Sequence, residues 1–93
     1  MPMRIEATSI TNATAGELLA EGTAAIARGE VDFDLSAVTE IDTAAIALLL
    51  DWQRQALARG SRLRLSGVPA DIASLAELYG VDELLHLDGQ RPA

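Results

Sequence analysis

The chain alternates short strand-like segments with longer helix-like segments, and this alternation constrains its fold more than any other feature. Strand patterns occupy residues 3–9, 31–35 and 62–66. Helical patterns follow them at residues 14–28, 44–59 and 69–80, and each is followed or closed by a glycine, a residue that commonly ends helices: Gly29, Gly60 and Gly80. Strands that alternate with helices of this length require crossover connections. We therefore predict an α/β fold with a small, mainly parallel sheet flanked by helices.

Local signals set the details of these elements. Thr14 and Glu17 have the spacing of a capping box, which would satisfy two free amides at the start of the first helix. Apolar residues at helical spacing predict the buried stripe of the second helix, at Ile46, Leu49, Leu50 and Leu57. The third helix should bury Ile72, Leu75, Ala76 and Tyr79, and residues 81–87 predict a further short helix.

Composition limits the functions that such a chain can have. Its 93 residues suggest one domain over residues 1–93. With a net charge of −7, the chain is not expected to have the basic face that binding to nucleic acid or anionic lipid requires. The longest apolar run, residues 44–50, is far shorter than a membrane span. We therefore expect a cytoplasmic protein without a signal peptide, direct membrane insertion or bound nucleic acid.

Signals of catalysis are weak. His86 is the only histidine and cysteine is absent, so a histidine- or thiolate-based metal site or a thiol nucleophile is not expected. Five acidic residues gather around one strand and loop: Glu30, Asp32, Asp34, Glu40 and Asp42. They could form a site for a hard cation, but we favour the alternative that they are solvated carboxylates on a loop. We predict no enzyme activity, cofactor or metal.

Residues 34–50 carry the most information about function. Asp42 and Thr43 stand at the start of the most apolar helix, where their side-chain oxygens can cap free backbone amides. A helix start also tolerates a phosphate, because it presents unpaired amides and positive partial charge. Thr43 is therefore either a capping residue alone or a hydroxyl at which added negative charge could repel a partner.

Leu48 and Trp52 lie four residues apart, in a different sector of this helix from the buried stripe. Tryptophan is enriched at the centres of protein interfaces. We favour a partner-binding role for this pair over the alternative that Trp52 covers the edge of the core.

The pattern Asp-Leu-Ser-x-Val-x-x-Ile-Asp-Thr-x-x-Ile-x-x-Leu-Leu at residues 34–50 resembles the signature of STAS domains. This family includes anti-sigma factor antagonists and the cytoplasmic tails of sulfate transporters. Residues 63–69 and 75–81 are similar to the MlaB type, the stand-alone STAS subunit of the Mla phospholipid ABC transporter. The resemblance is clear over residues 31–87 and implies a STAS-type fold, with the first strand of the usual N-terminal hairpin expected to be missing.

The resemblance implies two functions. In MlaB-type proteins the surface around Thr43 would bind the MlaF-like ATPase subunit beside its permease, with Asp42, Ala44, Leu48 and Trp52 as further partner-binding residues, and would place the chain peripherally at the inner membrane. In anti-sigma factor antagonists Thr43 would be phosphorylated by a partner kinase. Asp34 and Ser36 would shape the preceding loop. Ala44 and Ala45 depart from the family, which usually has a glycine here, and this disfavours phosphorylation more than docking. Nucleotide binding and a homodimer are further alternatives.

Overall fold

The computed structural model describes residues 3–81 and residue 85, and its elements follow the predicted alternation. The helices are α1 (Ala15–Ala27), α2 (Thr43–Ala58) and α3 (Ala70–Leu78). The strands are β1 (Met3–Arg4), β2 (Ser9–Ile10), β3 (Asp32–Asp34), β4 (Glu40–Ile41) and β5 (Arg64–Ser66).

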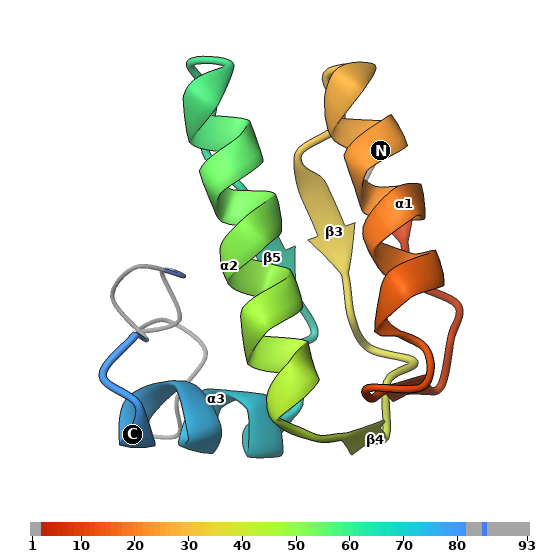
Figure 1. The fold of residues 1–93 in the computed structure, drawn as a ribbon, viewed down its shortest axis with the longest axis vertical. Helices are drawn as coiled ribbons and strands as arrows, with labels where there is room; N and C mark the ends of the chain where they lie inside the picture. Colours follow the sequence, from red (N-terminus) through yellow and green to blue (C-terminus); the bar gives the residue numbers. More distant parts are fainter. Residues whose placement is uncertain (1–2, 82–84, 86–93) are drawn as a thin grey trace.

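Within residues 3–81, every strand pair is parallel, which confirms the predicted sheet type. One sheet has the order β1-β3-β5, with Phe33 opposite Met3 on one side and Leu65 on the other. The second sheet pairs β2 with β4 and brings Ile10 beside Ile41. In Figure 1, α1 and α2 lie side by side over the face of the sheet that contains β3 and β5, and α3 crosses near the start of α2.

The central strand separates an apolar face from a charged one. Phe33 is fully buried beneath the helices, whereas its neighbours Asp32 and Asp34 are only partly buried, because successive side chains of a strand point to opposite faces. Arg64 of β5 lies opposite Asp32, with 3.9 Å between its Nε and an Asp32 carboxylate oxygen. The sheet therefore places its apolar side chains against α1 and α2 and its charges on the other face.

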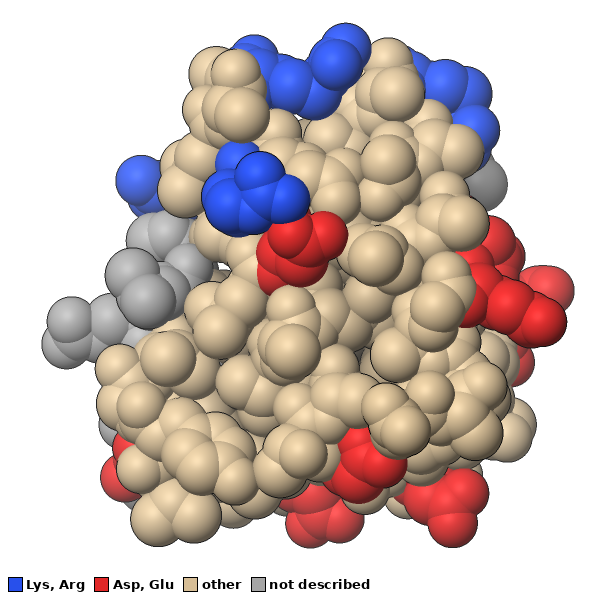
Figure 2. All heavy atoms as spheres, in the orientation of Figure 1, with Lys and Arg blue, Asp and Glu red and all other residues tan. Residues whose placement is uncertain are grey.

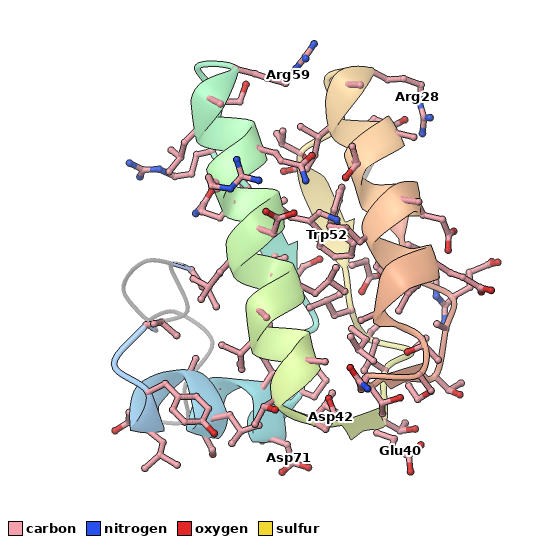
Figure 3. All side chains as sticks on the ribbon, viewed as in Figure 1. Arg28, Glu40, Asp42, Trp52, Arg59 and Asp71 are labelled. Atoms are coloured by element: carbon pink, nitrogen blue, oxygen red, sulfur yellow. The ribbon has the colours of Figure 1, made fainter. Side chains whose placement is uncertain are left out.

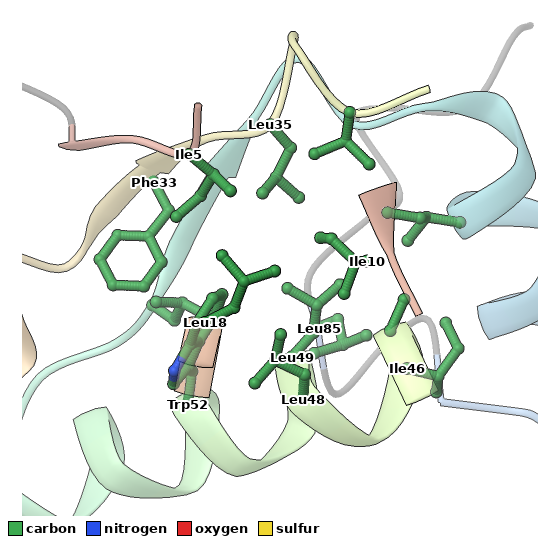
Figure 4. Close-up of a cluster of buried hydrophobic side chains, with 14 of the residues drawn as sticks. Ile5, Ile10, Leu18, Phe33, Leu35, Ile46, Leu48, Leu49, Trp52 and Leu85 are labelled. Carbon is green, nitrogen blue, oxygen red and sulfur yellow. The ribbon is translucent and has the colours of Figure 1, made fainter. Parts of the chain in front are cut away.

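Trp52 of α2 is the largest side chain in the core (Figure 4). Its ring is fully buried and meets the ring of Phe33 edge to face, at a centroid distance of 5.0 Å. Its indole Nε1–H donates to the carbonyl oxygen of Leu19 in α1 at 3.3 Å. Gly22, one turn further along α1, leaves the space that the ring fills. The packing of α1 on α2 thus depends on a large residue opposite a glycine.

The predicted helix ends are confirmed at Gly29, Gly60 and Gly80. Each glycine has a positive φ, which it adopts without the steric cost that a side chain would add. Beyond Gly60, the amide of Ser61 donates back to the carbonyl oxygen of Ala56 at 2.9 Å. The same carbonyl also accepts from the amide of the C-cap residue Arg59 at 3.1 Å, so the chain leaves α2 in a defined direction.

Several local predictions were wrong. The side chain of Thr14 makes no helix-capping bond; its hydroxyl accepts from the amide of Thr11 at 3.0 Å and donates to the carbonyl oxygen of Ser9 at 3.1 Å. The predicted strand over residues 3–9 is divided into β1 and β2, and β4 was not predicted. Leu57 is 54% exposed and Tyr79 52% exposed, so neither is a core residue.

The predictions for residues 81–87 and for His86 fall largely outside the described residues. The short helix at residues 81–87 falls on a segment of which only Val81 and Leu85 are described, and His86 is outside it.

Candidate functional site

Asp42 fixes the start of α2 and joins it to the chain before α1. It is the N-cap residue in an extended backbone conformation, and its Oδ1 accepts from the amide of Ala44 at 2.7 Å. Its Oδ2 accepts from the amide of Asn12 at 3.0 Å. The capping role predicted for Asp42 is confirmed, and the same carboxylate also holds the loop between β2 and α1 against the head of α2.

Thr43 is the first residue of α2 and is exposed. Asp42, immediately before it, is held by the backbone amides of two separate segments. The head of α2 therefore presents the Thr43 side chain from a well-supported backbone position. The backbone conformation at Thr43 is thus held by contacts within the chain itself.

Asp34 and Ser36 form a separate turn where β3 ends. The carboxylate of Asp34 accepts from the amide of Ser36 at 2.9 Å, and bonds from this amide and from the Ser36 side chain hold the pKa of Asp34 below its usual range. Gly67, with a φ of 62°, packs so closely that an added Cβ would lie 2.8 Å from the Cβ of Ser36. The turn after β3 therefore packs against Gly67, the residue that follows β5, and its described contacts hold these two strand ends together.

Trp52 was predicted as a partner-binding residue, and the structure corrects this. The side chain has 0% exposure and packs against Phe33 and α1. A residue so enclosed has no surface to offer, and the alternative of a packing role holds. Leu48 is also buried, with 4% exposure, but it lines a groove on the surface.

This groove, which we call the α1–α2 groove, was not predicted from the sequence. It has a volume of about 220 Å³ and runs between the first turns of α1 and the first half of α2. Its lining is Ala15, Gly16, Leu19, Ala44, Ala47, Leu48 and Asp51. The recurrence of residues 44, 47, 48 and 51 on one helical face was the available signal. Ala44, a predicted partner-binding residue, thus lies in the groove and directly follows Thr43.

Figure 2 shows basic side chains gathered at one end of the helices and acidic ones toward the other end and along one edge, with one basic side chain beside an acidic one in between. Arg28 and Arg59 lie where α1 and α2 end, whereas Glu40, Asp42 and Asp71 lie around the helix starts (Figure 3). Asp51 lies in the groove and bonds to Arg54, which is the main reason that the pKa of its carboxyl is lowered. The region around the helix starts, beside Thr43, is thus acidic, whereas the carboxylate of Asp51 in the groove is paired with Arg54.

Among residues 3–81 and 85, no three histidine or acidic side chains lie together in a way that could hold a metal ion. The acidic residues around β3 have separate contacts: Asp32 in β3 faces Arg64 of β5, while Asp42, at the end of the following loop, caps α2. In the same part of the chain, no helix is long and apolar enough to cross a membrane.

Comparison with known families decides the classification. A family model described as the MlaB STAS domain matches residues 5–86, which is nearly the whole chain. The chain belongs to the MlaB-type STAS domain family. The STAS resemblance of residues 34–50 and the STAS-type α/β fold are thereby confirmed. STAS domains are generally non-catalytic binding modules. No curated protein matches the chain significantly.

Proposed function

We propose that this STAS domain is a non-catalytic subunit that binds the cytoplasmic ATPase of an Mla-type phospholipid ABC transporter and stabilises or regulates it. The transporter would maintain the lipid asymmetry of the outer membrane. The observation that carries the proposal is the exposed Thr43 at the firmly capped start of α2, in a chain of the MlaB type.

The geometry suits docking for a physical reason. Binding costs free energy whenever a surface must be ordered first, so a surface fixed in advance binds more tightly. Asp42 fixes the head of α2 and the neighbouring loop through Ala44 and Asn12. Thr43 and the half-buried Ala44 then offer two small side chains that a partner can approach closely.

Charge substitution at this surface tests the proposal. The tagged chain is co-expressed with the ATPase and permease of its native host and then purified. Thr43→Glu should reduce the ATPase recovered by about tenfold, because an added charge buried at an interface costs at least 1.4 kcal/mol. Ser61→Glu, an equal change in charge at an exposed position beyond α2, should leave recovery unchanged. Equal recovery with both variants would show that the ATPase does not dock here.

The exposed hydroxyl of Thr43 also supports a second candidate, an anti-sigma factor antagonist that a kinase releases from its partner by phosphorylation. The start of α2 tolerates a phosphate, since free amides and the helix dipole favour negative charge there. Intact-mass measurement of the protein from its native host, across growth conditions, tests this candidate. A mass increase of one phosphate that Thr43→Val abolishes supports it, and its lasting absence counts against it.

A further inference from the structure

The α1–α2 groove has the size and lining of a protein docking site rather than of a small-molecule pocket. Its 220 Å³ is below the range of about 300–1,000 Å³ that is usual for ligand pockets. Its walls are mostly alanine, glycine and leucine, with Asp51 the one charged residue among them. Such a space fits one or two apolar side chains of a larger molecule.

The shape of the groove favours a helix as that molecule. Two roughly parallel helices form its walls, and small residues on both let a third backbone come close: Ala15 and Gly16 on α1, Ala44 and Ala47 on α2. Helices pack by placing a ridge of side chains into such a furrow. Amphipathic helices recognise apolar grooves in the same way.

The surrounding charges select the flanks of this helix. Asp51 lies in the groove, where it pairs with Arg54, and Glu40 and Asp42 lie at the head of α2 (Figure 3). Arg28 and Arg59 lie at the opposite end of the two helices (Figure 3). A helix with lysine or arginine beside its apolar ridge therefore complements the site, and one with acidic flanks is repelled.

We propose that the α1–α2 groove receives the apolar ridge of a partner helix whose flanks are basic. The inference deepens the proposed function, because it states what chemistry the partner must offer beside Thr43. Leu19 and Leu48 would contact the ridge, and Glu40 and Asp42 at the head of α2 would face the basic flanks.

Two synthetic helical peptides with the same leucine and alanine ridge test this, one with lysine and arginine flanks and the other with glutamate flanks. Each is titrated into the ¹⁵N-labelled protein, and amide chemical shifts are followed. The basic peptide should shift the amides of Gly16, Leu19, Ala44 and Ala47, and the acidic peptide should not. Ala47→Arg should weaken binding of the basic peptide by about tenfold, because it fills the groove and adds a like charge. Ala58→Arg, exposed on the same helix but outside the groove, is the matched control.

Shifts of equal size with both peptides, shifts confined to other surfaces, or no binding would overturn the proposal. Groove shifts that appear on raising the concentration of the protein alone would assign the groove to a second copy and also overturn it. The peptides replace the ATPase in this experiment, so its failure leaves the proposed function standing. Conversely, a pull-down without an ATPase would refute the proposed function but not the basic-helix site.

Discussion

Gly22 of α1 faces the indole ring of Trp52, and replacing it with alanine tests the packing of the two helices. A Cβ added at Gly22 would lie far inside 3.0 Å of the ring atoms Cε2, Nε1 and Cζ2. The ring has little room to move, because it is fully buried and lies edge to face with Phe33. Either α1 and α2 must separate or the ring must leave its position.

The opposing effects of this substitution give a magnitude. Overpacking of a tight core costs up to about 3 kcal/mol. Alanine gains about 1 kcal/mol over glycine within a helix. Gly22→Ala should therefore lower the free energy of unfolding by about 2 kcal/mol, which for a domain of this size lowers the Tm by about 8–16 °C. Circular dichroism during thermal and urea unfolding measures both quantities.

Gly16→Ala is the matched control in the same helix, because no atom lies within 4 Å of the Cβ that it adds. It should leave stability unchanged or raise it by up to about 1 kcal/mol. Trp52→Leu removes all three ring atoms that the new methyl group would strike, Cε2, Nε1 and Cζ2. In that background Gly22→Ala should cost almost nothing, a coupling of about 2 kcal/mol between the two positions. If Gly22→Ala alone melts at or above the wild-type temperature, the reasoning about this contact is refuted.

Three further predictions concern the turns and caps around the site. Asp42→Ala removes the cap of α2 and the bond to the preceding loop, so it should lower the free energy of unfolding by about 0.5–2 kcal/mol, measured by urea titration. Gly67→Ala should lower the Tm more than Gly60→Ala: both glycines have positive φ, but only Gly67 lacks room for a Cβ, and equal losses would contradict this. The lowered pKa of Asp34 means that its carboxylate stabilises the fold above the pKa of the unfolded chain, about 4, and that this contribution disappears as the pH falls through the lower folded value. The urea midpoints of the wild type and Asp34→Asn should therefore differ near pH 7 and converge below about pH 4, and a constant difference would argue against this role.

The sequence was sufficient for α1, α2 and α3 and for the strands β3 and β5, because their signals are local. Glycines and apolar periodicity mark where α1 and α2 end and which residues they contain. The strand β4 was beyond such reasoning, since its two residues become a strand only by pairing with β2, about thirty positions earlier. The capping box failed at Thr14 for a related reason, because its hydroxyl bonds instead to the backbone of residues 9 and 11.

The site was predicted in part, and Trp52 shows why. Periodicity placed Trp52 outside the predicted stripe, but the buried face of α2 contains both Trp52 and Leu49, which lie three positions apart. In the structure α2 contacts both the sheet and α1, so its buried face is broad and includes Trp52, whereas Leu57 of the predicted stripe is exposed. The complement to Trp52 is Gly22, thirty residues away, and a single sequence gives no sign that the two residues meet. The exposed Thr43 and the cap at Asp42 depended on local chemistry and were predictable.

The most direct test of the proposed function is affinity capture of the tagged protein from solubilised cells of its native host, with the bound proteins identified by mass spectrometry. The wild type should recover an ABC ATPase together with its membrane permease, Thr43→Glu should recover about tenfold less of both, and Ser61→Glu should recover as much as the wild type. Recovery of a kinase-like anti-sigma factor in place of the transporter would contradict the proposal and make Thr43 a phosphoacceptor.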